Sequence, residues 1–279
     1  MGYIGQSGRC LVSDIKARCS WTTWPLRSRE PFGLRTALGV IALMLCLLPA
    51  ATAAAQQRID VQVGGGITQP IALYAADREV ASAILFPGNS GSLMTVRNNF
   101  LVRVAGEFAA AGITAAVADV PSDQRGGVDD TFRASQAEAA DIAAIAAFLR
   151  ARVAAPVWLV GTSRGSISAA SAAARLGPPG ISGLVLTSSV WNGGMRQVAL
   201  STIRIPTLIV HNRNDSCPAS PFHGAAPALT ELTAAPAKEL IAVQSSSESG
   251  NPCEGKSPHG YFGIETQVVG LIAGWIKSH

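Results

Sequence analysis

The chain has 279 residues, of which 48% are hydrophobic and only 14% are charged. This composition supplies enough apolar side chains for a sizeable core and excludes a disordered polymer. The formal net charge is +4, and the whole excess lies in residues 1–55, which hold six basic and two acidic side chains. Residues 56–279 are neutral overall, which argues against a nucleic-acid-binding surface.

An uncharged, apolar stretch at residues 37–55 follows a basic segment and ends in small residues. This order predicts a secretory signal that is cleaved near Ala53 or Ala55. The stretch also approaches the length that spans a bilayer, so an uncleaved anchor is the alternative. We expect residues 1–55 to be an N-terminal extension with the signal segment, and the protein to be periplasmic or secreted.

After residue 56, short apolar runs alternate with longer, alanine-rich stretches. Strands are expected at residues 58–63, 71–74, 80–86, 113–120, 157–160, 183–187, 207–211 and 239–243. Helices are expected at residues 93–111, 132–154, 164–176, 226–233 and 261–277. Most of the strands are continuous β-branched or leucine runs, which is typical of strands buried on both faces of a parallel sheet. The alternation predicts an α/β domain over residues 56–279, with helices on both faces of a doubly wound, mostly parallel, eight-stranded sheet.

The pattern Gly-x-Ser-x-Gly occurs at residues 161–165, between an apolar strand and an alanine-rich helix. A strand that turns sharply into a helix exposes its central serine at a tight tip, where only small neighbours fit. The helix N-terminus there also favours negative charge. Ser163 is therefore the candidate nucleophile, and an ordinary Gly/Ser helix cap is the alternative.

A serine hydroxyl needs a base, and the base needs an orienting carboxylate. Asp215 follows the strand expected at 207–211, at the edge where open α/β sheets build their sites. The loop after the preceding strand offers Ser188, Ser189 and Asn192 but no carboxylate. Asp215 is thus the candidate acid, and a surface turn aspartate is the alternative.

The chain has four histidines. His279 is the last residue, His211 lies at a strand end as a packing or hydrogen-bonding residue, and His223 follows the candidate acid too closely. His259 comes after the last expected strand, in a loop with a glycine beside it, directly before the C-terminal helix. We expect His259 to be the base, rather than a solvated loop histidine.

The order Ser163, Asp215, His259 within this strand–helix pattern resembles the α/β-hydrolase superfamily, over essentially all of residues 58–278. The resemblance implies a nucleophile at Ser163, a general base and then acid at His259, and an orienting carboxylate at Asp215. It also implies an oxyanion hole from the backbone N–H groups of Arg164 and Asn89. The chain has Pro-Gly before Asn89, where the family more often has His-Gly.

Arg164 occupies a position that more often holds a neutral side chain in the family. Its expected partner is a nearby carboxylate such as Asp119 or Asp123, and recognition of an acidic substrate is the alternative. About fifteen residues separate the sixth and seventh expected strands, where the superfamily usually inserts a lid. A minimal lid or none is therefore expected.

Two cysteines, Cys217 and Cys253, lie after the signal segment, close to Asp215 and His259. If the acid and base loops converge, a disulfide between them is expected in an oxidising compartment, and two buried thiols are the alternative. The sequence shows no zinc-type His/Cys spacing and no dinucleotide fingerprint, so no cofactor is expected.

These features predict a serine hydrolase that cleaves a carboxylic ester or thioester, with a small-molecule substrate and no nucleic-acid partner. No stable association with a membrane is expected once the signal has been cleaved. A serine peptidase or amidase is the alternative enzyme, because the same triad serves both reactions. A non-catalytic binding protein on a hydrolase scaffold is the alternative of another class.

Overall fold

Three consecutive glycines make the turn of the first hairpin. In the computed structural model, which describes residues 55–247 and 250–279, Gly64, Gly65 and Gly66 have φ angles of 117°, 57° and 76°. Such angles suit glycine, which has no Cβ. The turn joins β1 (Gln56–Gly64) to β2 (Ile67–Tyr74) as an antiparallel pair. The predicted signal segment, through residue 54, lies outside the described residues.

Eight strands form one sheet in the order β1-β2-β4-β3-β5-β6-β7-β8. After the hairpin, the strands are β3 (Ala81–Phe86), β4 (Ile113–Ala118), β5 (Val157–Thr162), β6 (Gly183–Thr187), β7 (Thr207–Asn212) and β8 (Lys238–Val243). The β2–β4 pair is antiparallel, and every later pair is parallel. The predicted eight-stranded, mostly parallel sheet is confirmed.

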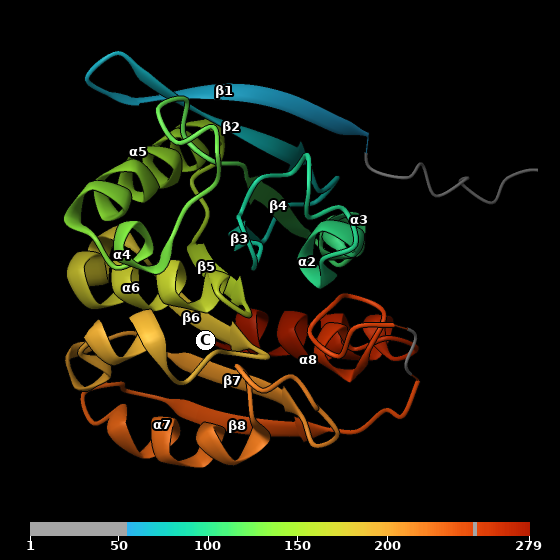
Figure 1. Cartoon of the computed structure of the whole chain (residues 1–279). Coiled ribbons are helices and arrows are strands. Elements are labelled where there is room, and N and C mark those ends of the chain that lie inside the picture. The colour runs from blue at the N-terminus through green and yellow to red at the C-terminus, as the bar shows by residue number, and fades with distance from the viewer. Residues whose placement is uncertain (1–54, 248–249) are drawn as a thin grey trace, which may run out of the picture. The chain divides into compact units, whose positions relative to one another are not determined.

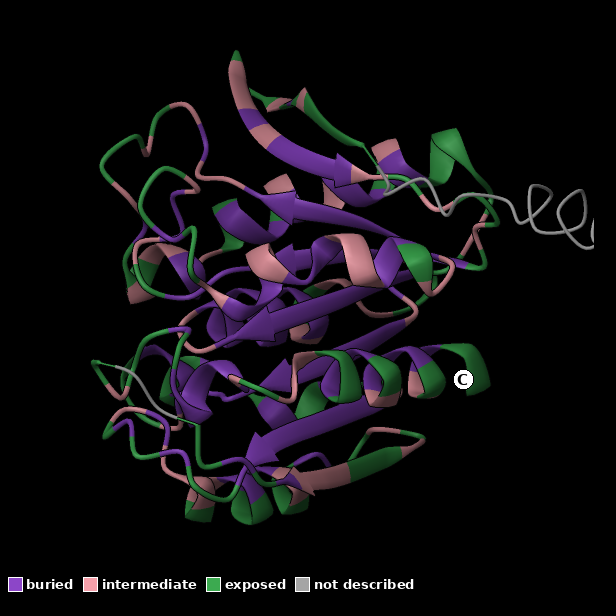
Figure 2. Ribbon diagram, turned by 90° about the vertical axis from the view of Figure 1, so that its right-hand side faces the viewer, coloured by how far each residue is buried: buried purple, intermediate pink, exposed green. Residues whose placement is uncertain are grey.

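Alternate side chains of the central strands pack on opposite faces of the sheet, as in β5, where Leu159 faces one core and Trp158 and Val160 the other. Helices cover both faces (Figure 1). One face carries α5 (Gln136–Arg152), α6 (Gly165–Gly180) and α7 (Ala225–Glu231), and the other carries α2 (Phe100–Arg103), α3 (Ala105–Ala110) and α8 (Glu265–Ser278). Figure 2 shows central strands that are buried along their length, whereas the outermost strand β1 is largely exposed.

Two of the predicted helices differ from the structure at polar caps, and each of them is divided in two, the first at Val104. The helix expected at 93–111 starts only after Asn99, whose side chain accepts a hydrogen bond from Leu101 N at 3.1 Å. The helix expected at 132–154 is two helices, α4 (Asp130–Arg133) and α5, and Ser135 caps the second by accepting from Glu138 N. Short polar side chains compete for backbone N–H groups and so favour helix starts.

The ends of the remaining helices follow backbone conformation. The helical part of α6 stops at Gly177, which has φ of 49°. The last helix begins at Glu265 rather than 261, because Tyr261 has φ of 56° and follows the short helix η4 (Pro258–Gly260). Between β6 and β7 the chain forms two short 3₁₀ helices, η1 (Gly193–Gln197) and η2 (Leu200–Thr202). The fold has no lid inserted there, as predicted.

Candidate active site

Ser163 lies at a sharp turn between β5 and α6, with φ of 53°. Its N–H donates to Thr187 O of the neighbouring strand at 3.1 Å. The two glycines of the motif fill places where no side chain fits. A Cβ on Gly161 would lie 2.4 Å from Gly165 O, and a Cβ on Gly165 would lie 2.0 Å from Phe86 O. Close backbone packing therefore explains why this turn needs glycine on both sides of the serine.

The loop after β3 lies directly against Ser163. A Cβ on Gly88 would lie 2.6 Å from Ser163 Cβ and 3.1 Å from Ser163 Oγ. The next residue, Asn89, has φ of 52°, and Arg164 is the N-terminal cap of α6. The backbone N–H groups of a first helical turn have no partner within the helix. Asn89 and Arg164 thus flank the serine from two elements, and their oxyanion role remains a prediction.

A buried arginine that the sequence analysis did not single out holds this loop. Arg133 is only 2% exposed, and its Nη2 donates to Pro87 O at 3.3 Å and Asn89 O at 3.2 Å. Its Nη1 donates to Ser168 Oγ at 2.9 Å, and that hydroxyl donates to Glu138 Oε1 at 2.9 Å. Burial lowers the pKa of Arg133 to about 10 and raises that of Glu138 to about 8. The Ser-x-x-Glu pattern at 135–138 could have marked this helix start, but nothing local reveals the arginine's partners.

Arg164 pairs with a nearby carboxylate, as expected, but the partner is Asp130 and the expected Asp119 or Asp123 is wrong. Its Nε lies 2.7 Å from Asp130 Oδ1, in an ion pair that is about one-third exposed. Asp119 instead accepts from Leu93 N at 3.0 Å. Asp130 begins the short helix α4, two residues before the start of the helix expected at 132–154, and its carboxylate lies beside Arg164. Asp130 Oδ2 also accepts from Gly194 N at 3.3 Å, so this carboxylate links the turn at Ser163 to η1.

The structure brings Asp215 and His259 into direct contact across 44 positions of the chain. His259 Nδ1 lies 2.9 Å from Asp215 Oδ2, and Cys217 N donates to Asp215 Oδ1 at 3.0 Å. Burial by itself raises the pKa of Asp215, but hydrogen bonding from His211 and His259, the nearby His259 charge and the Cys217 N–H outweigh it and hold the pKa at about 2. Because Nδ1 faces a carboxylate, it carries the proton, and the lone pair of the neutral ring is on Nε2.

His259 Nε2 is buried and has no hydrogen-bond partner among the described residues. A buried polar atom without a partner is unusual and requires an explanation. Ser163, at the carboxyl end of β5, and Asp215, after β7, lie on the same edge of the parallel sheet. This nitrogen is therefore available to a group that enters at that edge.

Three hydrogen bonds and a disulfide hold the His259 loop in place. Tyr261 OH donates to Val210 O at 2.7 Å and accepts from Ser188 N at 2.8 Å, which ties the loop to β7 and β6. Arg103 of α2 donates to Gly260 O at 3.0 Å. A disulfide joins Cys217 to Cys253 and so connects the loop after β7 to the segment that precedes His259. The base loop is thus fastened to three separate parts of the fold.

Asp215 has further polar neighbours that the sequence analysis missed. Ser220 Oγ donates to Asp215 Oδ2 at 3.0 Å, and His211 Nε2 lies 3.3 Å from the same oxygen. The hydrogen-bonding role expected of His211 agrees with its contact to Ser220 O at 3.0 Å. A histidine at the end of an apolar strand, four residues before the acid, was the available signal.

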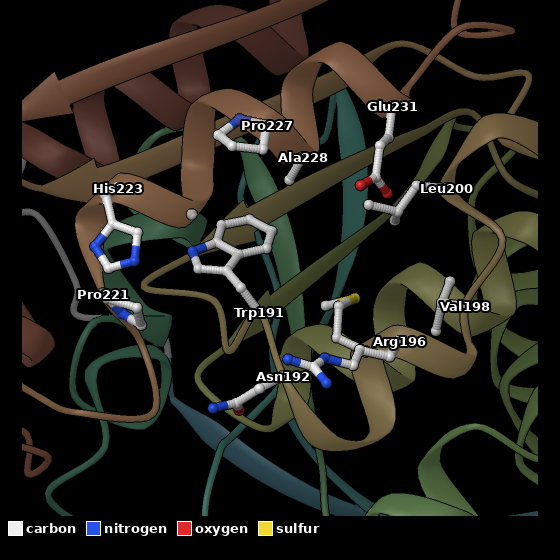
Figure 3. Close-up of a pocket in the computed structure, with 12 residues that line it drawn as sticks. Trp191, Asn192, Arg196, Val198, Leu200, Pro221, His223, Pro227, Ala228 and Glu231 are labelled. Carbon is white, nitrogen blue, oxygen red and sulfur yellow. The ribbon is translucent and has the colours of Figure 1, made fainter.

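A pocket of about 520 Å³ lies beside this corner, between the β6–β7 connection and α7 (Figure 3). Twelve residues line it: Trp191, Asn192, Met195, Arg196, Val198, Leu200, Pro221, His223, Gly224, Pro227, Ala228 and Glu231. Neither Ser163 nor His259 is among them, and the ring of Trp191 stacks on that of His211 at 6.0 Å between centroids. His223 thus lines this pocket, whereas His259 and His211 lie against the acid.

In the described part of the chain, no three His, Cys, Asp or Glu side chains are grouped so that they could hold a metal ion. The same residues include no helix that is long and apolar enough to cross a membrane.

Comparisons with known proteins give a clear answer only at the level of structure. No protein-family model matches the chain, and no curated protein matches it in sequence. A dienelactone hydrolase from Anabaena variabilis has a TM-score of 0.60 at 18% identity, with 81% of this chain and 99% of that chain covered.

A lidless α/β serine hydrolase from Xanthomonas campestris has a TM-score of 0.58 at 18% identity, covering 82% of this chain and 96% of that chain. A cold-adapted esterase from an Arctic intertidal metagenomic library has a TM-score of 0.55 at 17% identity, over 78% of this chain and 92% of that one. Together with the sheet order, these similarities show that the chain has the α/β-hydrolase fold.

Proposed function

We propose that this protein is a serine hydrolase that cleaves a carboxylic ester or thioester through an acyl-enzyme intermediate. The observation that carries the proposal is the His259–Asp215 pair, in which Nδ1 is bound to a buried carboxylate and Nε2 has no partner among the residues that the structure describes. An imidazole held in this tautomer can act as a general base, because the lone pair on Nε2 can accept a proton. Ser163, on a turn that closely packed glycines keep sharp, is the proposed donor and nucleophile.

In the proposed reaction, Ser163 Oγ attacks the ester carbonyl carbon while His259 Nε2 takes the hydroxyl proton. The tetrahedral intermediate collapses, the bond to the leaving oxygen or sulfur breaks, and His259 returns the proton to that atom. A water molecule then attacks the acyl carbon while His259 Nε2 takes a proton from it. The bond between the acyl group and Ser163 Oγ breaks, and His259 returns the proton to Oγ. Asp215 keeps the imidazole oriented and stabilises its positive charge in both halves.

The oxyanion of each tetrahedral intermediate is assigned to the backbone N–H groups of Arg164 and Asn89. Gly88 supports this assignment, because its backbone lies close enough to Ser163 that a Cβ would overlap the serine side chain. Loss of one such donor costs about 3–4 kcal/mol of transition-state stabilisation in comparable sites. Arg133, which donates to the carbonyl groups of Pro87 and Asn89, keeps this loop in place.

The names of the structural neighbours favour ester substrates, since they include a dienelactone hydrolase and an esterase. A serine peptidase or amidase is the second candidate. A binding protein without activity is the third, and the intact set of Ser163, Asp215 and His259 speaks against it.

Labelling with a fluorophosphonate probe tests the nucleophile. We expect one adduct, mapped by mass spectrometry to the peptide with Ser163, and none in Ser163→Ala. The matched control is Ser201→Ala, at an exposed serine of η2, which should label like the parent. An undiminished adduct in Ser163→Ala would refute the assignment.

A substrate series separates the enzymatic alternatives. Aryl esters of increasing acyl length and the matching anilides should be compared by kcat/KM. We expect hydrolysis of the esters and little of the anilides, whereas faster turnover of the anilides would favour the peptidase or amidase. Absence of both hydrolysis and labelling in the folded protein would favour the binding protein.

Export is part of the same proposal, and the disulfide between Cys217 and Cys253 supports it, because such bonds persist in oxidising compartments. Mass spectrometry of the exported protein should find a chain that begins between about residues 54 and 57, by the cleavage pattern of secretory signals. Recovery of the full apolar segment in a membrane fraction would support an anchor instead.

A further inference from the structure

Asp215 Oδ2 contacts more polar groups than a catalytic triad requires. Oδ2 accepts from His259 Nδ1 at 2.9 Å and from Ser220 Oγ at 3.0 Å, and His211 Nε2 lies 3.3 Å away. Oδ1 has a separate partner, the N–H of Cys217. The oxygen that holds the proposed base is therefore shared with two side chains on its other side.

The tautomer of His211 follows from its partners. Its Nε2 lies 3.0 Å from Ser220 O, which can only accept, so Nε2 carries the proton. That proton is directed to the Ser220 carbonyl and has Asp215 Oδ2 as a second, longer neighbour. His211 Nδ1 is buried without a partner among the described residues. His211 and Ser220, both 0% exposed, thus form a small polar cluster with Asp215 in the interior.

In the described part of the chain, aromatic side chains pack against the His211 ring. The ring of His211 stacks on Trp191 and meets the edge of Phe222, and the Arg213 guanidinium lies over the Phe222 ring at 5.1 Å from its centroid. On the base loop, burial is the main cause that raises the pKa of Tyr261, whose hydroxyl therefore stays neutral at working pH.

We propose that His211 and Ser220 are positioning residues that set the strength with which Asp215 holds His259. Ser220 donates to Oδ2 and the His211 N–H lies beside it, so both draw on the same negative charge and weaken the pull of that oxygen on the imidazolium. They also prevent rotation of the carboxylate, because Oδ2 is held from two sides and Oδ1 by Cys217. The inference rests on the proposed hydrolase function.

Removal of these donors should leave Asp215 as a stronger partner for the charged form of His259. The base would then keep its inhibitory proton up to a higher pH, and the acid limb of the kcat/KM profile would move upward. For Ser220→Ala we expect an upward shift of roughly half a pH unit, together with a several-fold lower plateau. His211→Leu should shift the limb in the same direction, through loss of the N–H that anchors Ser220.

Conservative variants distinguish this role from simple packing. Ser220→Thr keeps the hydroxyl and His211→Gln keeps an N–H donor, so both should return the limb to its original position. A purely structural role would lower the melting temperature or the plateau of Ser220→Ala and leave the limb unmoved. That result in a folded Ser220→Ala variant, or a shift that Ser220→Thr does not reverse, would overturn the inference.

The profiles should be recorded beside Ser163→Ala and His259→Gln in the same ester assay. If these two variants keep the parent rate, the proposed hydrolase function itself is wrong. If they lose activity and the limb of Ser220→Ala is unchanged, only the role of His211 and Ser220 is wrong.

Discussion

The two halves of the candidate site are built in different ways. The turn at Ser163 is made by backbone packing over five residues, in which Gly161 and Gly165 leave no room for a Cβ. The Asp215–His259 corner is made by side chains 44 positions apart, which hydrogen bonds and a disulfide hold together. The turn depends on the absence of a Cβ at its glycines. The Asp215–His259 corner depends on the presence of specific bonding partners.

This difference predicts two kinds of failure. An added methyl group at the turn has nowhere to go, because its neighbours are backbone atoms that cannot move independently. At the corner, His259 is supported by Asp215, Ser257, the Arg103 contact and the disulfide. Loss of one support there should lower activity only in part, because the others still hold His259. Loss of the imidazole itself should abolish activity.

The largest expected effect is loss of the base. His259→Gln should lower kcat by roughly 10⁶-fold, close to the effect of Ser163→Ala, because members of a triad act as a unit. Asp215→Asn should be milder, and His223→Gln, at an exposed pocket residue, should be close to the parent. Rates on an aryl ester measure this, and an inactive His223→Gln beside an active His259→Gln would reverse the assignment of the base.

A single methyl group tests the other half. Gly88→Ala should lower kcat by about 10²–10³-fold, the range for a lost oxyanion donor, because its Cβ would lie 2.6 Å from Ser163 Cβ. Gly126→Ala is the matched control, since a Cβ there meets nothing within 4 Å. Equal activities of the two alanine variants would show that the turn tolerates the added atom, contrary to the comparison.

Removal of the disulfide should lower stability more clearly than activity. Cys217→Ser with Cys253→Ser removes a tether between positions 36 apart, worth about 3–4 kcal/mol in the chain-entropy model. We expect the melting temperature to fall by roughly 6–15 °C, and activity to fall less than in His259→Gln. A reductant should reproduce the effect in the parent and change nothing in the double variant.

Thiol mapping provides the direct check on this bond. The protein is unfolded without a reductant and treated with an alkylating reagent. We expect the peptides that contain Cys217 and Cys253 to remain unmodified. Alkylation of both cysteines would contradict the bridge and favour two buried thiols.

The smallest expected effect concerns the support behind the turn. Burial raises the pKa of Glu138 from 4.5 to about 8, so the folded state favours the protonated carboxyl. The stabilisation is complete below the unfolded value and is lost as the pH rises toward about 8. We expect the melting temperature to decline by a few degrees across this window, and Glu138→Gln to reduce the decline. Glu231→Gln, at an exposed residue, should keep the slope of the parent, and an equal slope in Glu138→Gln would contradict the assignment.

Much of this architecture was predictable because its signals are local. Strand periodicity and the Gly-x-Ser-x-Gly turn each depend on neighbours within a few residues, and the structure has the predicted sheet. The placement of Asp215 and His259 after late strands also followed from the sequence, because the carboxyl ends of parallel strands share one edge. The helix expected at 93–111 failed where the polar cap at Asn99 outweighed the apolar pattern.

The partners of individual side chains were decided only by the tertiary structure. Arg164 pairs with Asp130 rather than Asp119, Arg133 reaches two carbonyl groups on the loop after β3, and His211 and Ser220 meet on Asp215. Many carboxylates and carbonyls in the chain are chemically equivalent as partners. Which of them a side chain meets depends on crossovers and loop paths tens of residues long, and a one-dimensional pattern does not contain those positions.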